Sequence, residues 1–148
     1  MFLLPSFERM MAWREFREGI KTFSEEKQLD EVASLGGLVP TVNYVIDPYK
    51  PDTWPTPWEL VNKGDFDEAS IAYFLEQTLI LLGWDEARLN IIIANDTVEG
   101  KTKIALMVDE KYLLNWHHGR VFLIDKMNTG CAYLMKYKIV DGQHIFAE

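Results

Sequence analysis

Apolar residues in the first part of the chain recur at alternating three- and four-residue steps. Between Ser6 and Lys27, a stretch without proline, they fall at Met10, Trp13, Phe16, Ile20 and Phe23. This spacing predicts an amphipathic helix with a narrow apolar stripe. The stripe either packs on the chain's own core or forms a docking or oligomerisation surface built on Met10, Trp13, Phe16 and Ile20.

Gly36, Gly37 and Pro40 interrupt this helical pattern. We therefore expect an N-terminal helix and linker over residues 1–37 and one globular unit over residues 38–148. The chain has 148 residues, of which 48% are hydrophobic and 13% aromatic. A chain of this size and composition can bury a sizeable core.

A second helical pattern runs from about residue 66 to residue 82. Asp65 is placed to cap its first turn, and Glu68 follows three residues later, in the spacing of a capping box. Apolar residues then recur at Ala69, Ala72, Leu75, Leu79 and Leu82, and Gly83 offers a C-terminal stop. The free N–H groups of a first turn would lower the pKa of a thiol placed there. The chain instead carries Phe66 at this position, which can neither ionise nor attack a carbonyl.

After Gly83 the pattern becomes that of short strands. The runs are rich in β-branched and aromatic residues and are separated by turn signals such as Asp141-Gly142; they cover residues 89–94, 103–108, 111–116, 120–124 and 133–139. Runs joined by such short links form an antiparallel sheet. One buried helix against an antiparallel sheet predicts an α+β fold.

The charge balance argues against a nucleic-acid partner, and the cysteine content argues against an internal disulfide. The formal net charge is −8 and the isoelectric point is near 4.9, whereas binding to a nucleic-acid backbone requires clustered Lys and Arg. One cysteine cannot form an internal disulfide, which fits a reducing compartment. The apolar start is interrupted by Glu8, which is too early for a signal peptide or a membrane span. We expect no nucleic-acid or membrane partner and no cofactor.

The segment from residue 44 to residue 74 carries a specific series of motifs. It reads Tyr44-Val-Ile-Asp47, then Trp54-Pro-Thr-Pro-Trp-Glu59, then Gly64-Asp-Phe-Asp-Glu-Ala69. This series resembles the bacterial transglutaminase-like cysteine proteinase family, whose pattern is Tyr-x-x-Asp, Trp-x-Thr-Pro-x-Glu and Gly-Asp-Cys-Glu-Asp-Tyr-Ala. The resemblance covers roughly residues 38–146. It implies a papain-like core in which a helix packs on an antiparallel β-sheet.

The resemblance also locates the family's Cys-His-Asp triad in this chain. The nucleophile falls on Phe66, the base on Lys103 and the orienting residue on Asn115. Lys103 could shift by one or two positions, because the segment 95–102 has no rigid anchor. No histidine lies between Asp85 and Trp116, so no shift along this strand supplies the base that a thiol–imidazole pair needs. The resemblance therefore implies a degenerate triad with no catalytic residue.

From the degenerate triad we predict a pseudoenzyme that binds other proteins in a multi-subunit assembly. The leading expectation is a structural part of a phage particle, in its head, connector or tail, by analogy with small phage proteins of this type. The alternative is a regulator or inhibitor that mimics a host cysteine protease. These roles place the chain in the cytoplasm or in a virion.

A further alternative keeps an enzyme with relocated chemistry. Cys131 could act as a nucleophile beside His117, His118 or His144. A lone cysteine is more often a small buried hydrophobe than a catalyst, and Cys131 does not begin a predicted helix.

Two groups of residues suggest metal binding without requiring it. His117 and His118 could share a metal with Asp125 or Asp141, but adjacent residues on a strand point to opposite faces. Some members of the resembled family bind calcium near the nucleophile, and this chain has carboxylates there at Asp47, Asp52, Asp65, Asp67 and Glu68. Because Asp67 and Glu68 also suit the start of a helix, we predict no metal site.

The segment Trp54-Pro-Thr-Pro-Trp58 has two interpretations as well. Its prolines hold the chain extended, so Trp54 and Trp58 could form an aromatic shelf for a partner protein. The favoured interpretation is that the segment packs on the core.

Overall fold

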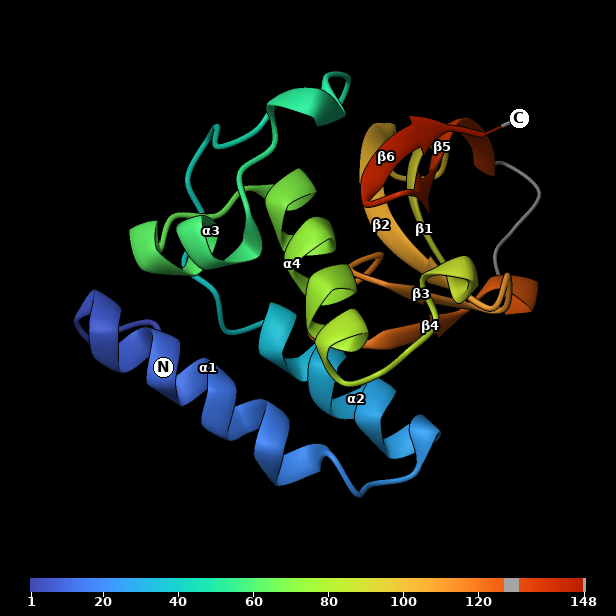
Figure 1. The fold of residues 1–148 in the computed structure, drawn as a ribbon. Coiled ribbons are helices and arrows are strands. Elements are labelled where there is room, and N and C mark those ends of the chain that lie inside the picture. The colour runs from blue at the N-terminus through green and yellow to red at the C-terminus, as the bar shows by residue number, and fades with distance from the viewer. Residues whose placement is uncertain (127–130, 148) are drawn as a thin grey trace.

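The computed structural model describes residues 1–126 and 131–147, with only the backbone of residues 131–134. Its helices are α1 (Ser6–Ile20), α2 (Glu25–Gly36), α3 (Pro57–Lys63) and α4 (Glu68–Leu81). Its strands are β1 (Leu89–Asp96), β2 (Lys101–Val108), β3 (Tyr112–Leu114), β4 (Val121–Leu123), β5 (Cys131–Val140) and β6 (Gln143–Phe146). Figure 1 shows α4 between the sheet and the other helices. The predicted α+β class is confirmed.

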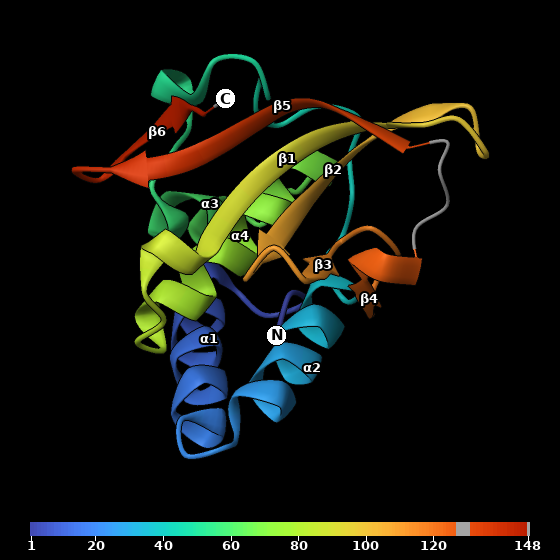
Figure 2. The same ribbon diagram turned by 90° about the vertical axis from the view of Figure 1, so that its right-hand side faces the viewer.

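The six strands form one antiparallel sheet in the order β4-β3-β2-β1-β5-β6. Its centre is β1, which pairs with β2 and also with β5, and these three strands run side by side in Figure 2. The sequence pattern predicted five strands, and β6 is an addition. It follows β5 through Asp141 and Gly142, both at positive φ, as a tight two-residue hairpin requires.

The two faces of the sheet are covered differently. Ile104, Leu106 and Val108 of β2 belong to the main core on the side of α4. Ala105 and Met107 belong to a second, smaller cluster that contains Trp116. This alternation is the period of two expected for a strand, and it decides which residues of β2 can face α4.

The N-terminal segment forms two helices where the sequence pattern predicted one helix from Ser6 to Lys27. The break falls at residues 21–24, and the Ser24 side chain caps α2 by accepting a hydrogen bond from the backbone N–H of Lys27. Gln28 stabilises the corner, because its Nε2 donates to the backbone oxygens of Ile20 and Lys21. A stripe of apolar residues cannot reveal this break, since the same spacing continues across it.

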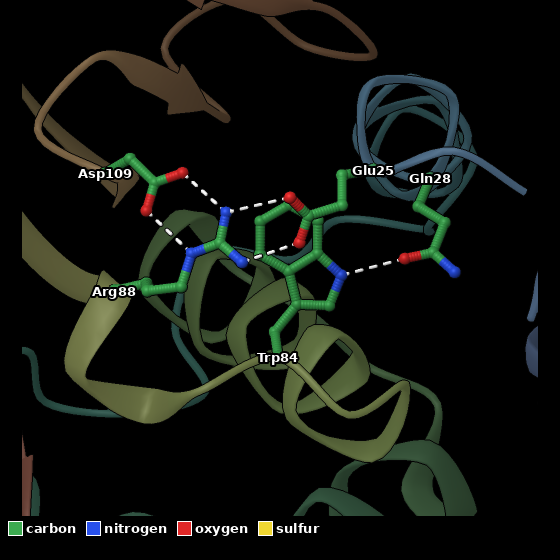
Figure 3. A network of polar contacts seen from close by, with 5 residues as sticks. All are labelled: Glu25, Gln28, Trp84, Arg88 and Asp109. Atoms are coloured by element: carbon green, nitrogen blue, oxygen red, sulfur yellow. Dashed lines mark hydrogen bonds and ion pairs between the residues drawn. The ribbon is translucent and has the colours of Figure 1, made fainter.

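Polar contacts tie α2 to the segment that enters the sheet, as Figure 3 shows. The Arg88 guanidinium makes two hydrogen bonds of 2.7 Å to Asp109 and two to Glu25, at 2.6 and 3.3 Å. It also lies 4.2 Å from the ring centroid of Trp84, whose Nε1 donates to Gln28 at 2.8 Å. Arg88 therefore joins three parts of the chain that are distant in sequence.

The segment that contains the two tryptophans is not extended throughout. A short 3-10 turn covers Pro51–Thr53, and α3 begins at Pro57, so Trp58 is helical. Thr56 caps α3 in a capping box with Glu59, and Pro57 occupies the first turn, where a missing N–H costs nothing. Among the described residues, no helix has the length and apolar character needed to span a membrane.

Candidate functional site

The residue that matches the family's nucleophile lies at the N-terminal end of α4. Phe66 immediately precedes the N-cap residue Asp67 and is fully buried. The sequence predicted Asp65 as the cap with Glu68 as its partner, whereas the structure pairs Asp67 with Ser70 in a capping box. The second carboxylate oxygen of Asp67 accepts the backbone N–H groups of residues 45 and 46. These tertiary contacts, which local sequence does not encode, select Asp67 as the cap.

Phe66 belongs to a packed aromatic cluster. Its ring centroid lies 5.4 Å from that of Phe2 and 5.3 Å from that of Phe74, and Trp13 lies 5.3 Å from Phe74. The backbone of residues 41 and 42 also runs along Phe66, with the N–H of Val42 donating to its carbonyl. This end of α4, which we call the tip, is therefore closed by protein on several sides.

The position of the expected base needs a correction. Lys103 points to the face of the sheet opposite α4, where its Nζ lies 4.7 Å from the ring centroid of Trp116. Its ammonium forms ion pairs with Asp96 at 3.3 Å and Glu99 at 3.1 Å. Because the strand alternates, Ile104 is the β2 residue at this level on the α4 side. The side chain that would correspond to the base is therefore aliphatic.

Asn115 does lie beside the tip, as the resemblance implied. Its Nδ2 donates to the backbone oxygens of Glu68 and Ile104, both at 3.1 Å. Its Oδ1 is buried without a hydrogen-bond partner. The oxygen that could orient an imidazole is present, but the nearby β2 residue offers no donor.

The carboxylates at the tip do not fit a calcium site. Both oxygens of Asp67 accept backbone N–H groups, and Glu68 accepts the N–H of Ile104 at 2.9 Å. Burial is the main cause that raises the pKa of Glu68, which disfavours the charged form that a cation requires. Among the described residues, no group of three His, Cys, Asp or Glu side chains is arranged to hold a metal.

The six predicted protein-contact residues divide into two groups. Trp13 and Ile20 are buried in the core, because α1 packs against α3 and the Trp13 indole donates to Thr78 of α4. They cannot contact a partner. Met10, Phe16 and Trp54 are partly buried against the core, and Trp58 is 48% exposed. The contact role of these four residues stays a prediction.

A surface pocket of about 510 Å³ lies along a different side of α4. It is lined by residues 51, 52 and 54–57, by Tyr73, Gln77 and Ile80 of α4, by Glu86, and by the β5–β6 hairpin with His144. Trp54, Tyr73 and His144 form an aromatic trio in its wall, with ring centroids 4.9 to 5.6 Å apart. None of these rings lies at the tip.

A carboxylate–imidazole pair stands behind this pocket. Glu76 is fully buried, and its Oε1 lies 2.6 Å from Nε2 of His144 and 3.0 Å from Nε2 of Gln77. The other oxygen, Oε2, is buried without a partner. In the tautomer whose Nε2–H donates to this carboxylate, the neutral His144 ring carries its lone pair on Nδ1. The contact with Glu76 thus uses Nε2, and Nδ1 is the second nitrogen of this pocket residue.

Tyr73 supplies a hydroxyl to the same pocket. Burial is the main cause that raises the pKa of its phenol, and the negative charge of Glu76 raises it further. The hydroxyl is therefore protonated at neutral pH and can donate a hydrogen bond. With His144, it gives the pocket one group that accepts a proton and one that stabilises negative charge.

The sequence-based prediction included His144 only as a partner for Cys131, and it did not include Glu76. The Cys131 side chain lies outside the described residues. Glu76 did leave a signal in the sequence, because it is an ionisable residue that follows the apolar run 71–75 of this helix. A carboxylate in such a place must find a partner.

Solved structures similar to this chain are those of LapG from Legionella pneumophila. The calcium-bound form gives a TM-score of 0.74 at 20% identity and covers 91% of this chain and 77% of LapG. LapG and its EGTA-treated form each give 0.72 at 19% identity and cover 90% of this chain and 74% of theirs. No family model matches the chain, and no curated protein matches its sequence. LapG is a bacterial transglutaminase-like cysteine protease, so the transglutaminase-like fold is confirmed.

The comparison contradicts the predicted function. We expected a pseudoenzyme that serves as a phage structural subunit or as a protease mimic, but the similar structures are those of an active, calcium-dependent cysteine protease. That prediction rested on the three triad positions, Phe66, Lys103 and Asn115, and the alternative of relocated chemistry was considered only for Cys131. We withdraw the inactive-subunit interpretation.

Proposed function

We propose that this chain is a hydrolase that cleaves polypeptides, with His144 and Glu76 as its acid–base pair. The single observation that carries the proposal is the 2.6 Å contact between a fully buried carboxylate and an imidazole that lines a pocket. The fold supports the choice of substrate class, because the similar structures belong to a protease.

The residues divide the reaction between them. His144 Nδ1 takes a proton from a water molecule while the water oxygen attacks the carbonyl carbon of the scissile amide. The hydroxyl of Tyr73 donates to the oxygen that becomes negative. The C–N bond then breaks as the same proton passes from His144 to the leaving nitrogen, so that one amide and one water give one acid and one amine. Glu76 is a positioning residue that fixes the ring and its tautomer.

The test is hydrolysis of fluorescein-labelled casein by the full chain, with the cleaved bonds identified by mass spectrometry. His144→Gln keeps a donor for Glu76 but removes the base, so we expect turnover to fall by about 100-fold or more. His118→Gln is the matched control, since His118 is exposed outside the pocket, and we expect its turnover to be unchanged. Absence of cleavage by the parent chain would contradict the proposal.

Iodoacetamide distinguishes this mechanism from a thiol mechanism. Water is the nucleophile here, so alkylation of the single cysteine should leave turnover intact. Loss of turnover on alkylation, together with equal loss of turnover in Cys131→Ser, would assign the nucleophile to that thiol and would contradict attack by water.

A further inference from the structure

The pocket beside His144 combines aromatic rings with unpaired negative charge. Trp54 and Tyr73 present their rings in its wall, 5.5 Å apart between centroids. Asp52 and Glu86 contribute exposed carboxylates to the same lining. In the described part of the chain, neither carboxylate forms an ion pair. The lining contains no lysine or arginine.

We propose that this pocket binds the cationic side chain, lysine or arginine, of a polypeptide substrate. An ammonium or guanidinium group is attracted by the faces of tryptophan and tyrosine rings as well as by carboxylates, and the alkyl stem of these side chains packs well on aromatic surface. A neutral or acidic side chain would gain neither attraction. The inference rests on the proposed function, because it names the substrate residue that the same pocket selects.

The remaining geometry agrees with a preformed site. The Trp54 indole N–H donates to the backbone oxygen of Asp47 at 2.8 Å, and its ring contacts Tyr137 with centroids 5.8 Å apart. These two contacts hold the ring in place before any ligand binds. The volume of about 510 Å³ lies within the range of small-ligand sites and is ample for one long side chain.

The fully buried Glu76 adds to this negative field. Its second oxygen is buried and has no hydrogen-bond partner among the described residues. This carboxylate contacts the lining residue His144, so it lies next to the pocket that would hold the cation. The overall charge of −8 favours the approach of a basic substrate segment as well.

The test is binding of Nα-acetyl-lysine methylamide, followed through the Trp54 indole N–H signal in a nitrogen-15 NMR spectrum. The norleucine analogue, which lacks the charged amine, is the neutral control ligand. We expect the lysine and arginine derivatives to shift the signal and the norleucine derivative to leave it unchanged. Trp54→Leu, followed through backbone signals of the lining, should weaken binding by about 5- to 30-fold, as expected for loss of a cation–π contact.

Trp58→Leu is the matched control, because Trp58 is an exposed tryptophan outside the pocket, and it should bind the lysine derivative normally. Replacement of both carboxylates, by Asp52→Asn with Glu86→Gln, should weaken binding of the lysine derivative. Equal binding of the norleucine derivative, or binding of neither ligand, would overturn the inference. Because binding requires no turnover, a lysine derivative that binds without casein cleavage would contradict the proposed function alone. Casein cleavage without preference for bonds near Lys or Arg would contradict this inference alone.

Discussion

The two sides of α4 use their polar atoms in opposite ways. At the tip, Asp67 and Glu68 bond to backbone N–H groups of their own chain, and Phe66 fills the space between them and the N-terminus. Along the pocket, Tyr73 and His144 keep polar atoms available at a surface cavity. The polar groups at the tip therefore stabilise the fold, whereas those of the pocket are the ones that a substrate or ligand could contact.

This difference teaches that a family motif can locate a structural landmark without locating the chemistry. The motif correctly placed residue 66 at the start of a helix and Asn115 beside it. Whether those positions hold a catalytic group is a separate question, which side-chain identity and hydrogen bonding decide. We expect substitutions at the tip to change stability and substitutions in the pocket to change binding and turnover.

The largest expected effect on stability is at Phe66. Phe66→Ala removes a fully buried ring from the aromatic cluster and leaves a cavity, so the free energy of unfolding should fall by about 3–5 kcal/mol. Urea denaturation measures this loss. Phe7→Ala is the matched control, because Phe7 is 75% exposed, and its effect should stay below about 0.5 kcal/mol. Equal effects at the two positions would show that the tip is not packed as described.

A smaller loss is expected at Asn115. Asn115→Ala removes two hydrogen bonds to backbone oxygens and places alanine at a φ of 69°, so unfolding should become easier by about 2–4 kcal/mol. Asn115→Gly removes the same hydrogen bonds but accepts this φ without strain. Denaturation should therefore rank glycine above alanine at this position. The reverse order would argue against the left-handed backbone.

The smallest expected effect is at Arg88, which directly precedes β1. Arg88→Lys loses the forked contacts to Glu25 and Asp109, and because solvent screens these exposed groups we expect the smallest loss of unfolding free energy of the three substitutions. Hydrogen bonds from Arg88 lower the pKa of Asp109 and of Glu25. The stabilisation is therefore present above the ordinary carboxyl pKa values and is lost as pH falls through the lowered ones.

The pH dependence of this stability difference distinguishes the ion pairs of Arg88 from its contact with Trp84. The difference in unfolding free energy between the parent chain and Arg88→Lys should be constant near neutral pH and shrink below about pH 4, where the carboxylates become protonated. A difference that persists unchanged in acid would mean that Arg88 stabilises the fold through its contact with Trp84 instead.

Sequence patterns recovered the fold class and most of the sheet, because strand alternation and turn residues are local signals. They missed the break between α1 and α2, since the apolar spacing continues through it. The family resemblance assigned the base to Lys103, whereas Ile104 is the β2 residue that faces α4. A shift of one residue along a strand moves every side chain to the other face of the sheet. The alignment of β2 with the family pattern cannot be fixed to one residue, because the preceding segment 95–102 contains no motif that sets it.

The pocket was beyond sequence analysis for a different reason. It brings together Trp54, Tyr73 and His144, which are distant in the chain and meet only when β6 adds to the edge of the sheet. The strand β6 itself was not predicted. The one local clue was Glu76 after the apolar run 71–75, which indicates a buried partner but does not say which residue provides it.

The most direct test compares the two sides of α4 by the same assay. Casein hydrolysis is measured for Phe66→Leu, which keeps an apolar side chain at the tip, and for His144→Gln in the pocket, with folding of both verified by circular dichroism. We predict turnover within about twofold of the parent chain for Phe66→Leu and a loss of about 100-fold or more for His144→Gln. Normal turnover of His144→Gln, together with loss of turnover in Phe66→Leu, would place the chemistry at the tip and contradict the account.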